Sequence, residues 1–482
     1  MLTYALAAKL TRHAGSAFAV LACWAFHDSV AFAQPEPASA PAASEPRPEP
    51  PRLVQPDIAR GLEEPRGIEA EDVALALPRA IFAVPNAFIG VLFTPLREGL
   101  RYVEKHHVIE RVEDFLYLND EHTAAILPVI TLSTFFGAQI GVQAFHDNLG
   151  GHGESGRIKA SWGADREQQY VVSFKADHVG GTPLWVESIT TFEDHPSVRF
   201  YGIGGDNSTA ELGRRADPRE ASIESLFAEQ RLRQLLTVGA TLGERGLEGQ
   251  LGARGRFKAY EFSAPRGFKP DVDRRLVDVY DTSQIIGYDD EPIVSELEAV
   301  ANIAVRDATG KSAHAFLAEA YGGGALPLRD YRYAQFGASV TGVIDLFHGN
   351  RLLVLRAVYQ AVAGPTENIP FVELPSLGGP HRLRGYPLHR FVDEKAFVAT
   401  VEYQYPVHEF LAGTLFCDVG EVSQNFEGLF DNPRFHVGGG GGLIVRKKEK
   451  VYLTAEIAGG EGVQVVLTTD PLRAFADRDD LL

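Results

Sequence analysis

The sequence has very little cysteine and fewer basic than acidic side chains. Of its 482 residues, two are cysteines, Cys23 and Cys417. Because Cys23 lies within a predicted export signal, only Cys417 would remain after cleavage, which excludes an intrachain disulfide. The 46 lysines and arginines are outnumbered by 64 aspartates and glutamates, for a formal net charge of −18. This balance argues against a general nucleic-acid-binding protein, which would carry a basic surface.

Complete catalytic and metal-binding motifs are also missing. The segment GHGESGR places Arg157 where a nucleophile elbow needs a glycine. The segment TGKS at 309–312 lacks the upstream glycine of a phosphate-binding loop. His106, His107 and Glu110 have the helical spacing of a metal site, but such a pattern is typical of a solvated helix face. We therefore predict a protein that is not an enzyme and has no cofactor and no metal ion.

The N-terminal part is predicted to consist of three segments. Residues 1–33 are predicted to be a signal peptide, with a short basic start, an apolar run and an A-x-A cleavage site before Gln34. Residues 34–57 form a Pro/Ala-rich linker that cannot build a core. In residues 58–121, apolar side chains recur at helical spacing between charged ones. This predicts an amphipathic helical segment in the periplasm or at a membrane interface.

A stretch without charge, residues 123–145, has the length and hydropathy of a transmembrane helix. It is, however, rich in valine, isoleucine, threonine and phenylalanine, and it contains Pro128, Gln139 and Gln143. That composition disfavours a helix that spans a bilayer and is typical of strands.

Beyond residue 121, short segments with alternating apolar and polar side chains follow one another. Clear examples are residues 296–306, 353–361, 397–405 and 451–457. In each of them an apolar face lies opposite a face with polar or charged groups. A period of two residues with one apolar face is the signature of a β-strand.

Two architectures share this pattern, a soluble β-sandwich and an outer-membrane β-barrel. The many sequential strands favour the barrel, and charges on the second face would be costly in a sandwich core. We predict an all-β protein with a transmembrane antiparallel barrel of about 16 strands over residues 122–475. The expected location is the bacterial outer membrane, which the chain would cross many times, with its N-terminal segment in the periplasm.

Several segments resemble the BamA/TamA family of outer-membrane proteins, also called the bacterial surface antigen family. They are LGGPHRLRGY, FVATVEYQYPV and LFCDVGEV, together with RFYGIGGDNS and VANIAVRDATG nearer the N-terminus. The resemblance implies that a long extracellular loop folds back into the barrel lumen and docks on the inner wall. Its tip would be Arg384-Gly385-Tyr386, and Arg384 would pair with Glu402 and Asp418.

The residues themselves support this interpretation of the loop. Strand alternation places Glu402 and Asp418 on the lumenal face, and a buried guanidinium needs carboxylate partners. Gly385 allows a sharp turn, and the glycine run 438–442 would let another backbone approach closely. We predict that the loop tip passes this run. The alternatives are a disordered surface loop and a paired-acid site formed by Glu402 and Asp418.

The family resemblance also implies a function. Family members insert or translocate proteins, or lipids, through a strained seam between the first and last strands, which we place between residues 139–145 and 462–469. Typical members carry POTRA domains, for which residues 58–121 are too few and too helical, so a passive pore or surface antigen is the alternative. The expected partners are outer-membrane lipids and substrate proteins, with no nucleic acid, and the expected state is a monomer or homodimer.

Overall fold

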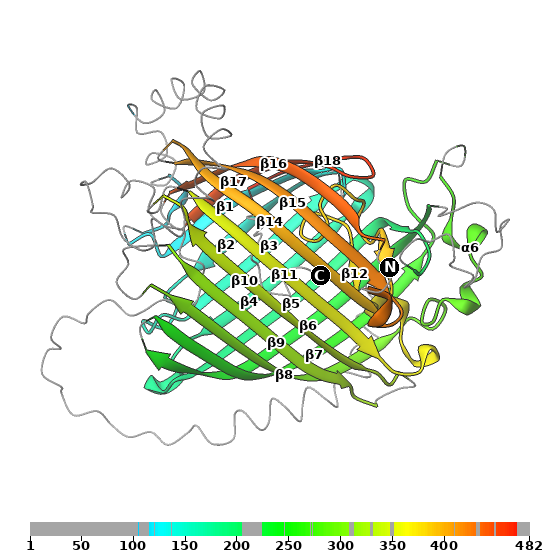
Figure 1. Cartoon of the computed structure of the whole chain (residues 1–482), viewed down its shortest axis with the longest axis horizontal. Coiled ribbons are helices and arrows are strands. Elements are labelled where there is room, and N and C mark those ends of the chain that lie inside the picture. The colour runs from blue at the N-terminus through cyan, green and yellow to red at the C-terminus, as the bar shows by residue number, and fades with distance from the viewer. Residues whose placement is uncertain are drawn as a thin grey trace, which may run out of the picture. The chain divides into compact units, whose positions relative to one another are not determined.

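A computed structural model shows the arrangement of the chain (Figure 1). It describes residues 105, 115–119 and 121–469, except for residues 136, 205–223, 245, 270, 272, 308–312, 328–330, 348–350, 409, 430–433 and 448–449. All described residues belong to one compact unit, residues 51–482. The predicted signal peptide and linker, and nearly all of the predicted helical segment, lie outside the described residues.

The described chain forms a closed antiparallel barrel of 16 strands, which confirms the predicted fold class. In chain order the barrel strands are β1 (Ala124–Ser133), β2 (Gly137–His146), β3 (Ser155–Gly163), β4 (Gln168–Ala176), β5 (Leu184–Phe200), β6 (Ser225–Glu244), β7 (Leu247–Ser263), β8 (Ile293–Arg306), β9 (Ala315–Ala325), β10 (Ala334–Asp345), β11 (Leu352–Ala363), β14 (Lys395–His408), β15 (Leu411–Ser423), β16 (His436–Lys447), β17 (Lys450–Gly459) and β18 (Val463–Thr468). Among the described residues, no helix has the length and apolar character needed to cross a membrane.

The two faces of each barrel strand differ in polarity. On β8, the Leu297 and Ile303 side chains are 54% and 50% exposed, whereas Glu296 and Glu298 are 2% exposed. The apolar face therefore points outward to lipid and the charged face points into the lumen, as in outer-membrane barrels. Because one face of each strand is apolar and the other is polar, the strands have the same alternating sequence pattern as strands of a soluble β-sandwich.

The connections at the two ends of the barrel differ in length. One end carries the connections 201–224, 264–292 and 364–394, whereas the other carries turns such as 245–246 and 409–410. Outer-membrane barrels have short periplasmic turns and longer extracellular loops. We therefore assign the end with the long connections, where the short helix α6 (Leu276–Val279) lies, as extracellular (Figure 1).

A hydrophobic cluster ties the long connections together at the extracellular end. Phe371 from the connection after β11 packs with Phe200 at the end of β5, and their ring centroids are 5.8 Å apart. The cluster is completed by Phe227, Leu276, Val279, Tyr280 and Ile285. Burial of aromatic side chains stabilises this end of the barrel without a disulfide.

The charge-free run of the sequence forms a β-hairpin, and this corrects the predicted seam. Strands β1 and β2 pair over their full lengths, from Ala124 opposite His146 to Ser133 opposite Gly137. The barrel closes between β1 and β18, so the assignment of residues 139–145 to the first strand is wrong. Local alternation within residues 123–145 does not show that two strands with a turn between them fill this stretch, so the strand at the seam could not be chosen from it.

A charge on the outer face tests this orientation of the strands. Val340 lies in β10 and is 42% exposed. We expect Val340→Lys to cost about 2–4 kcal/mol of folding free energy, because the ammonium group would face lipid. Urea-dependent folding into lipid vesicles measures this loss. Leu149→Lys is the control, since Leu149 is 55% exposed in the connection 147–154 and should tolerate lysine. Equal stability of both variants would contradict the assigned faces.

Candidate functional site

The connection 364–394 folds into the barrel. Its two halves pair as a small ribbon of β12 (Ser376–Leu377) and β13 (Phe391–Val392). Leu377, Leu383 and Phe391 of this loop are buried in one cluster with Val398 of β14 and Val422 of β15. Apolar packing against the inner wall therefore holds the loop in the lumen.

Arg384 of this loop is bound to two acids on the barrel wall. Its Nε and Nη2 donate to the two carboxylate oxygens of Asp418 at 2.9 and 3.0 Å, and its Nη1 donates to Glu402 at 3.1 Å. The backbone amide of Arg384 also donates to Asp418, at 2.9 Å. The guanidinium fork thus meets Asp418 in a bidentate pair, the geometry that gives such pairs their strength.

Two further groups surround the Arg384 guanidinium. The guanidinium carbon Cζ lies 3.4 Å from the centre of the Phe416 ring, a cation–π contact. Glu456 of β17 lies 3.6 Å from Nη1. Burial by itself would lower the pKa of Arg384, but the hydrogen bond to Asp418 and the nearby acids raise it above its ordinary value. Arg384 therefore remains charged and connects β14, β15 and β17.

The other two residues of the tip contact glycine backbones. Gly385 has a φ of 97°, which favours glycine, and a side chain there would overlap Gly459 at the end of β17. The Tyr386 hydroxyl donates to the carbonyl of Val437 at 3.2 Å. The tip therefore lies across the extracellular ends of β16 and β17.

The glycine run 438–442 has more than one role. A Cβ at Gly438 would overlap the carbonyl oxygen of Arg384, so the loop tip does pass this run, at its first residue. A Cβ at Gly440 would meet the Ile457 carbonyl oxygen first and then the Phe416 ring, which packs on Arg384. A Cβ at Gly442 would meet the Ala455 carbonyl oxygen and the Glu456 side chain. The run thus makes room for the tip and for the side chains that surround Arg384.

Further contacts tie the loop to two extracellular connections. Arg390 pairs with Glu461 in the turn 460–462, and its guanidinium lies 4.7 Å from the Tyr201 ring centre. The Gly204 amide donates to the carbonyl of Val392 at 2.7 Å. Contacts at the tip and at the base of the loop therefore restrain it at separate points.

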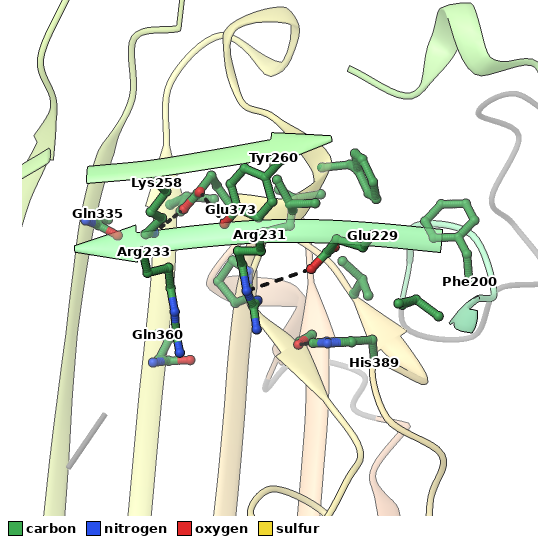
Figure 2. A pocket seen from close by; sticks show the side chains of 18 of the residues that line it. Phe200, Glu229, Arg231, Arg233, Lys258, Tyr260, Gln335, Gln360, Glu373 and His389 are labelled. Carbon is green, nitrogen blue, oxygen red and sulfur yellow. Dashed lines mark hydrogen bonds and ion pairs between the residues drawn. The ribbon is translucent and has the colours of Figure 1, made fainter. Parts of the chain in front are cut away.

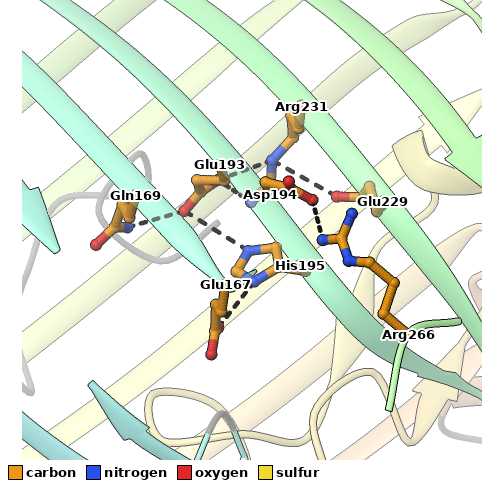
Figure 3. A network of polar contacts seen from close by, with 8 residues as sticks. All are labelled: Glu167, Gln169, Glu193, Asp194, His195, Glu229, Arg231 and Arg266. Atoms are coloured by element: carbon orange, nitrogen blue, oxygen red, sulfur yellow. Dashed lines mark hydrogen bonds and ion pairs between the residues drawn. The ribbon is translucent and has the colours of Figure 1, made fainter. Parts of the chain in front are cut away.

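A second polar network lies on the inner wall of β4 to β6, and local sequence patterns hardly indicate it. His195 lies between Glu167 and Glu193, with Nδ1 3.2 Å from Glu167 and Nε2 4.0 Å from Glu193 (Figure 3). Glu193 accepts from Arg231 Nε at 2.9 Å, and Asp194 pairs with Arg266. The only sequence signal is the charged segment Glu193-Asp194-His195 within an otherwise alternating strand, where the register shifts after His195.

Arg384 occupies the two acids that the sequence offered as a paired-acid site. Glu402 and Asp418 are both engaged by Arg384, which leaves neither as a member of a paired-acid site. Within the described part of the chain, no group of histidine, cysteine and acidic side chains has the geometry of a metal site. The structure thus brings together all five predicted residues, and their role in function remains a prediction.

Comparison with known proteins identifies the domain. Residues 300–448 match the Omp85 superfamily domain. The matched part of the barrel runs from β8 to β16 and contains the loop tip together with both acids that bind Arg384. It has the fold of a bacterial outer-membrane protein, and the resemblance stated from the sequence is confirmed at this level.

Two solved structures are similar to the chain at low sequence identity. CdiB from Escherichia coli is 8% identical with a TM-score of 0.50, and the match covers 71% of this chain and 62% of CdiB. BamA from Haemophilus ducreyi lacking POTRA domains 1–3 is 14% identical with a TM-score of 0.47, over 72% of this chain and 70% of that one. The chain thus spans less than two thirds of CdiB. No curated protein matches the chain.

Removal of the Arg384 guanidinium should weaken the barrel. Arg384→Ala leaves two buried carboxylates without their cation, and breaking such a buried pair costs about 3–5 kcal/mol. We expect the folded barrel to lose its heat-resistant mobility on gels at a lower temperature. Arg384→Lys keeps the charge without the planar fork, so its transition temperature should lie between those of the wild type and Arg384→Ala. If Arg384→Ala has the same heat transition as the wild type, the ion pairs of Arg384 do not stabilise the barrel.

A single methyl group at Gly438 tests the seat of the loop tip. We expect Gly438→Ala to lower the same heat transition, because the Cβ would collide with the Arg384 carbonyl and displace the tip. Gly342→Ala is the matched control, since Gly342 lies in β10 and has open space where its Cβ would stand. If both alanine variants melt alike, the close approach at Gly438 does not matter for stability.

Proposed function

We propose that this Omp85 barrel inserts or translocates proteins, or lipids, at the outer membrane through the seam between β1 and β18. The loop 364–394 would act as a lumenal strut that keeps the barrel wall in shape while the seam opens. The N-terminal segment would lie in the periplasm, and the protein would have no enzymatic activity. Its partners would be outer-membrane lipids and substrate proteins.

The observation that carries this proposal is the short pairing at the seam. Among the described residues, strands β1 and β18 are in register over three residue pairs, from Thr131 opposite Thr468 to Ser133 opposite Val466. By comparison, β1 and β2 are in register over ten pairs. The seam therefore has fewer backbone hydrogen bonds to break than the neighbouring strand pair, and it is the place where the barrel can open at least cost.

The first residues of β1, at its periplasmic end, offer an edge to an incoming strand. The Ala124 carbonyl accepts from Leu118 at 2.8 Å, and the Pro128 carbonyl accepts from Thr469 at 3.2 Å. Between them, no strand pairs with Ile126 on the β18 side among the described residues. An extended peptide could add to such an edge through main-chain hydrogen bonds.

The Arg384 group lies on strands next to the seam but not at it. It connects β14, β15 and β17, whereas the seam lies between β18 and β1. If β18 moves away from β1, the ion pairs on the three strands can stay intact. This separation supports a strut that preserves the wall during opening.

A passive pore or surface antigen is the alternative function. A pore needs an open path, but the loop 364–394 and its ion pairs occupy part of the lumen. This occupancy favours the assembly role, and conductance of the purified protein across a planar bilayer would measure the alternative directly.

A reversible lock across the seam tests the proposed function. The Thr131 and Thr468 hydroxyl oxygens are 2.8 Å apart, so cysteines at these positions would be close enough to form a disulfide. In a Cys417→Ser background, we expect Thr131→Cys with Thr468→Cys to deplete a subset of outer-membrane proteins or surface lipids in the host. Addition of reductant should restore them. Quantitative analysis of the outer-membrane inventory measures the effect.

The control is a second lock elsewhere in the barrel. Gln143 and Lys159 face each other across β2 and β3, which do not form the seam, so cysteines there should leave the inventory unchanged. An unchanged inventory with the seam fully locked would overturn the lateral-opening function and leave the passive barrel.

A further inference from the structure

The lumen holds a cavity between the barrel wall and the inserted loop. Its volume is about 110 Å³, which leaves room for several water-sized groups. Figure 2 shows Arg231, Arg233 and Lys258 on the β6 and β7 wall of this cavity. Arg256 from β7 and Arg382 from the loop line it as well. The lining is therefore rich in basic side chains, in a chain whose net charge is negative.

The basic side chains of the wall have carboxylate partners. Arg231 donates to Glu193 at 2.9 Å, Arg256 pairs with Glu298 at 3.0 Å and Lys258 with Glu296 at 3.1 Å. Lys258 also pairs with Glu373 of the loop at 2.6 Å. The wall of the cavity is thus close to neutral around these three cations.

Arg382 differs from the cations of the wall. It is 6% exposed, and its Nη1 donates to the amide oxygen of Gln360. Within the described part of the chain, its Nε and Nη2 have no hydrogen-bond partner, and it forms no ion pair with a carboxylate. Burial and the nearby Arg356 lower the pKa of Arg382 to about 10, so it is still a cation at neutral pH. A buried cation without a counter-charge is costly to a folded protein.

The His389 imidazole is also affected by the positive charges around the cavity. His389 also lines the cavity, and its Nδ1 lies 2.8 Å from the Ser376 hydroxyl. Burial, Arg231 and Arg382 lower the pKa of His389 to about 4. The imidazole is therefore neutral at physiological pH and adds no further charge, but it cannot neutralise the guanidinium.

We propose that this cavity binds a small oxyanion, with Arg382 as its principal contact. A carboxylate or phosphate group presents two oxygen atoms to a guanidinium, and Arg382 has two nitrogen atoms without partners to receive them. The volume admits a small ion rather than a folded segment. Because Arg382 and Arg384 lie on the same loop, the bound anion also stabilises the inserted form of that loop.

The test measures anion-dependent stability of the full-length barrel in detergent. Phosphate or acetate is titrated against chloride at constant ionic strength, and the midpoint of the heat transition is followed. A ligand that binds only the folded state raises this midpoint, by about 2–4 °C or more at saturation. The buffer to which the anions are added contains neither sulfate nor phosphate. No difference between phosphate, acetate and chloride in the wild-type protein would overturn the proposal.

Two variants locate the response. Arg382→Gln should weaken the apparent affinity for the effective anion by about tenfold or more, because the charge-assisted bidentate pair is lost. Arg157→Gln is the charge-matched control, since Arg157 is half-buried in β3 and does not line the cavity. An equal loss in both variants, or an unchanged affinity in Arg382→Gln, would place the binding elsewhere. Each variant is compared through its anion-dependent shift, so a change in basal stability does not obscure the result.

Discussion

The need to satisfy every backbone hydrogen bond in lipid is the constraint on which the rest of this structure depends. A sheet can meet it only by closing on itself, so β1 must meet β18. Closure then gives each strand one face toward lipid and one toward a confined lumen. Charged side chains such as Glu296, Glu298 and Glu402 are nearly inaccessible there, each 2% exposed. The lumen must therefore provide its own counter-charges.

The inserted loop provides one of these counter-charges, and the barrel wall provides most of the others. Arg384 neutralises acids of β14 and β15, whereas Arg256 and Lys258 neutralise acids of the adjacent β8. The difference has a mechanical consequence. Cross-strand pairs such as Arg256 with Glu298 join neighbours that are already hydrogen-bonded, but Arg384 connects the loop to strands on both sides of β16. The Arg384 contact therefore joins β17 to β14 and β15, which are not its neighbours in the sheet.

Much of the fold could be predicted from local patterns. A period of two residues is set by the strand backbone itself, so the lipid face of β8 was recognisable from Leu297 and Ile303. The partnership of Arg384 with Glu402 and Asp418 was accessible because motif resemblance and strand alternation agreed. The first strand was missed because residues 123–146 hold two strands, and local alternation does not say which of them closes the barrel.

The sequence by itself determined the strand class, the lipid-facing and lumenal faces and the loop that carries Arg384, because each depends on residues close together in the chain. Only the tertiary structure decided which strands meet at the seam, that Glu167 and Glu193 flank His195, and that Arg382 has no carboxylate partner. These features depend on barrel closure and on the path of the loop through the lumen. Both bring together residues that are far apart in the chain, which a local pattern of residues cannot encode.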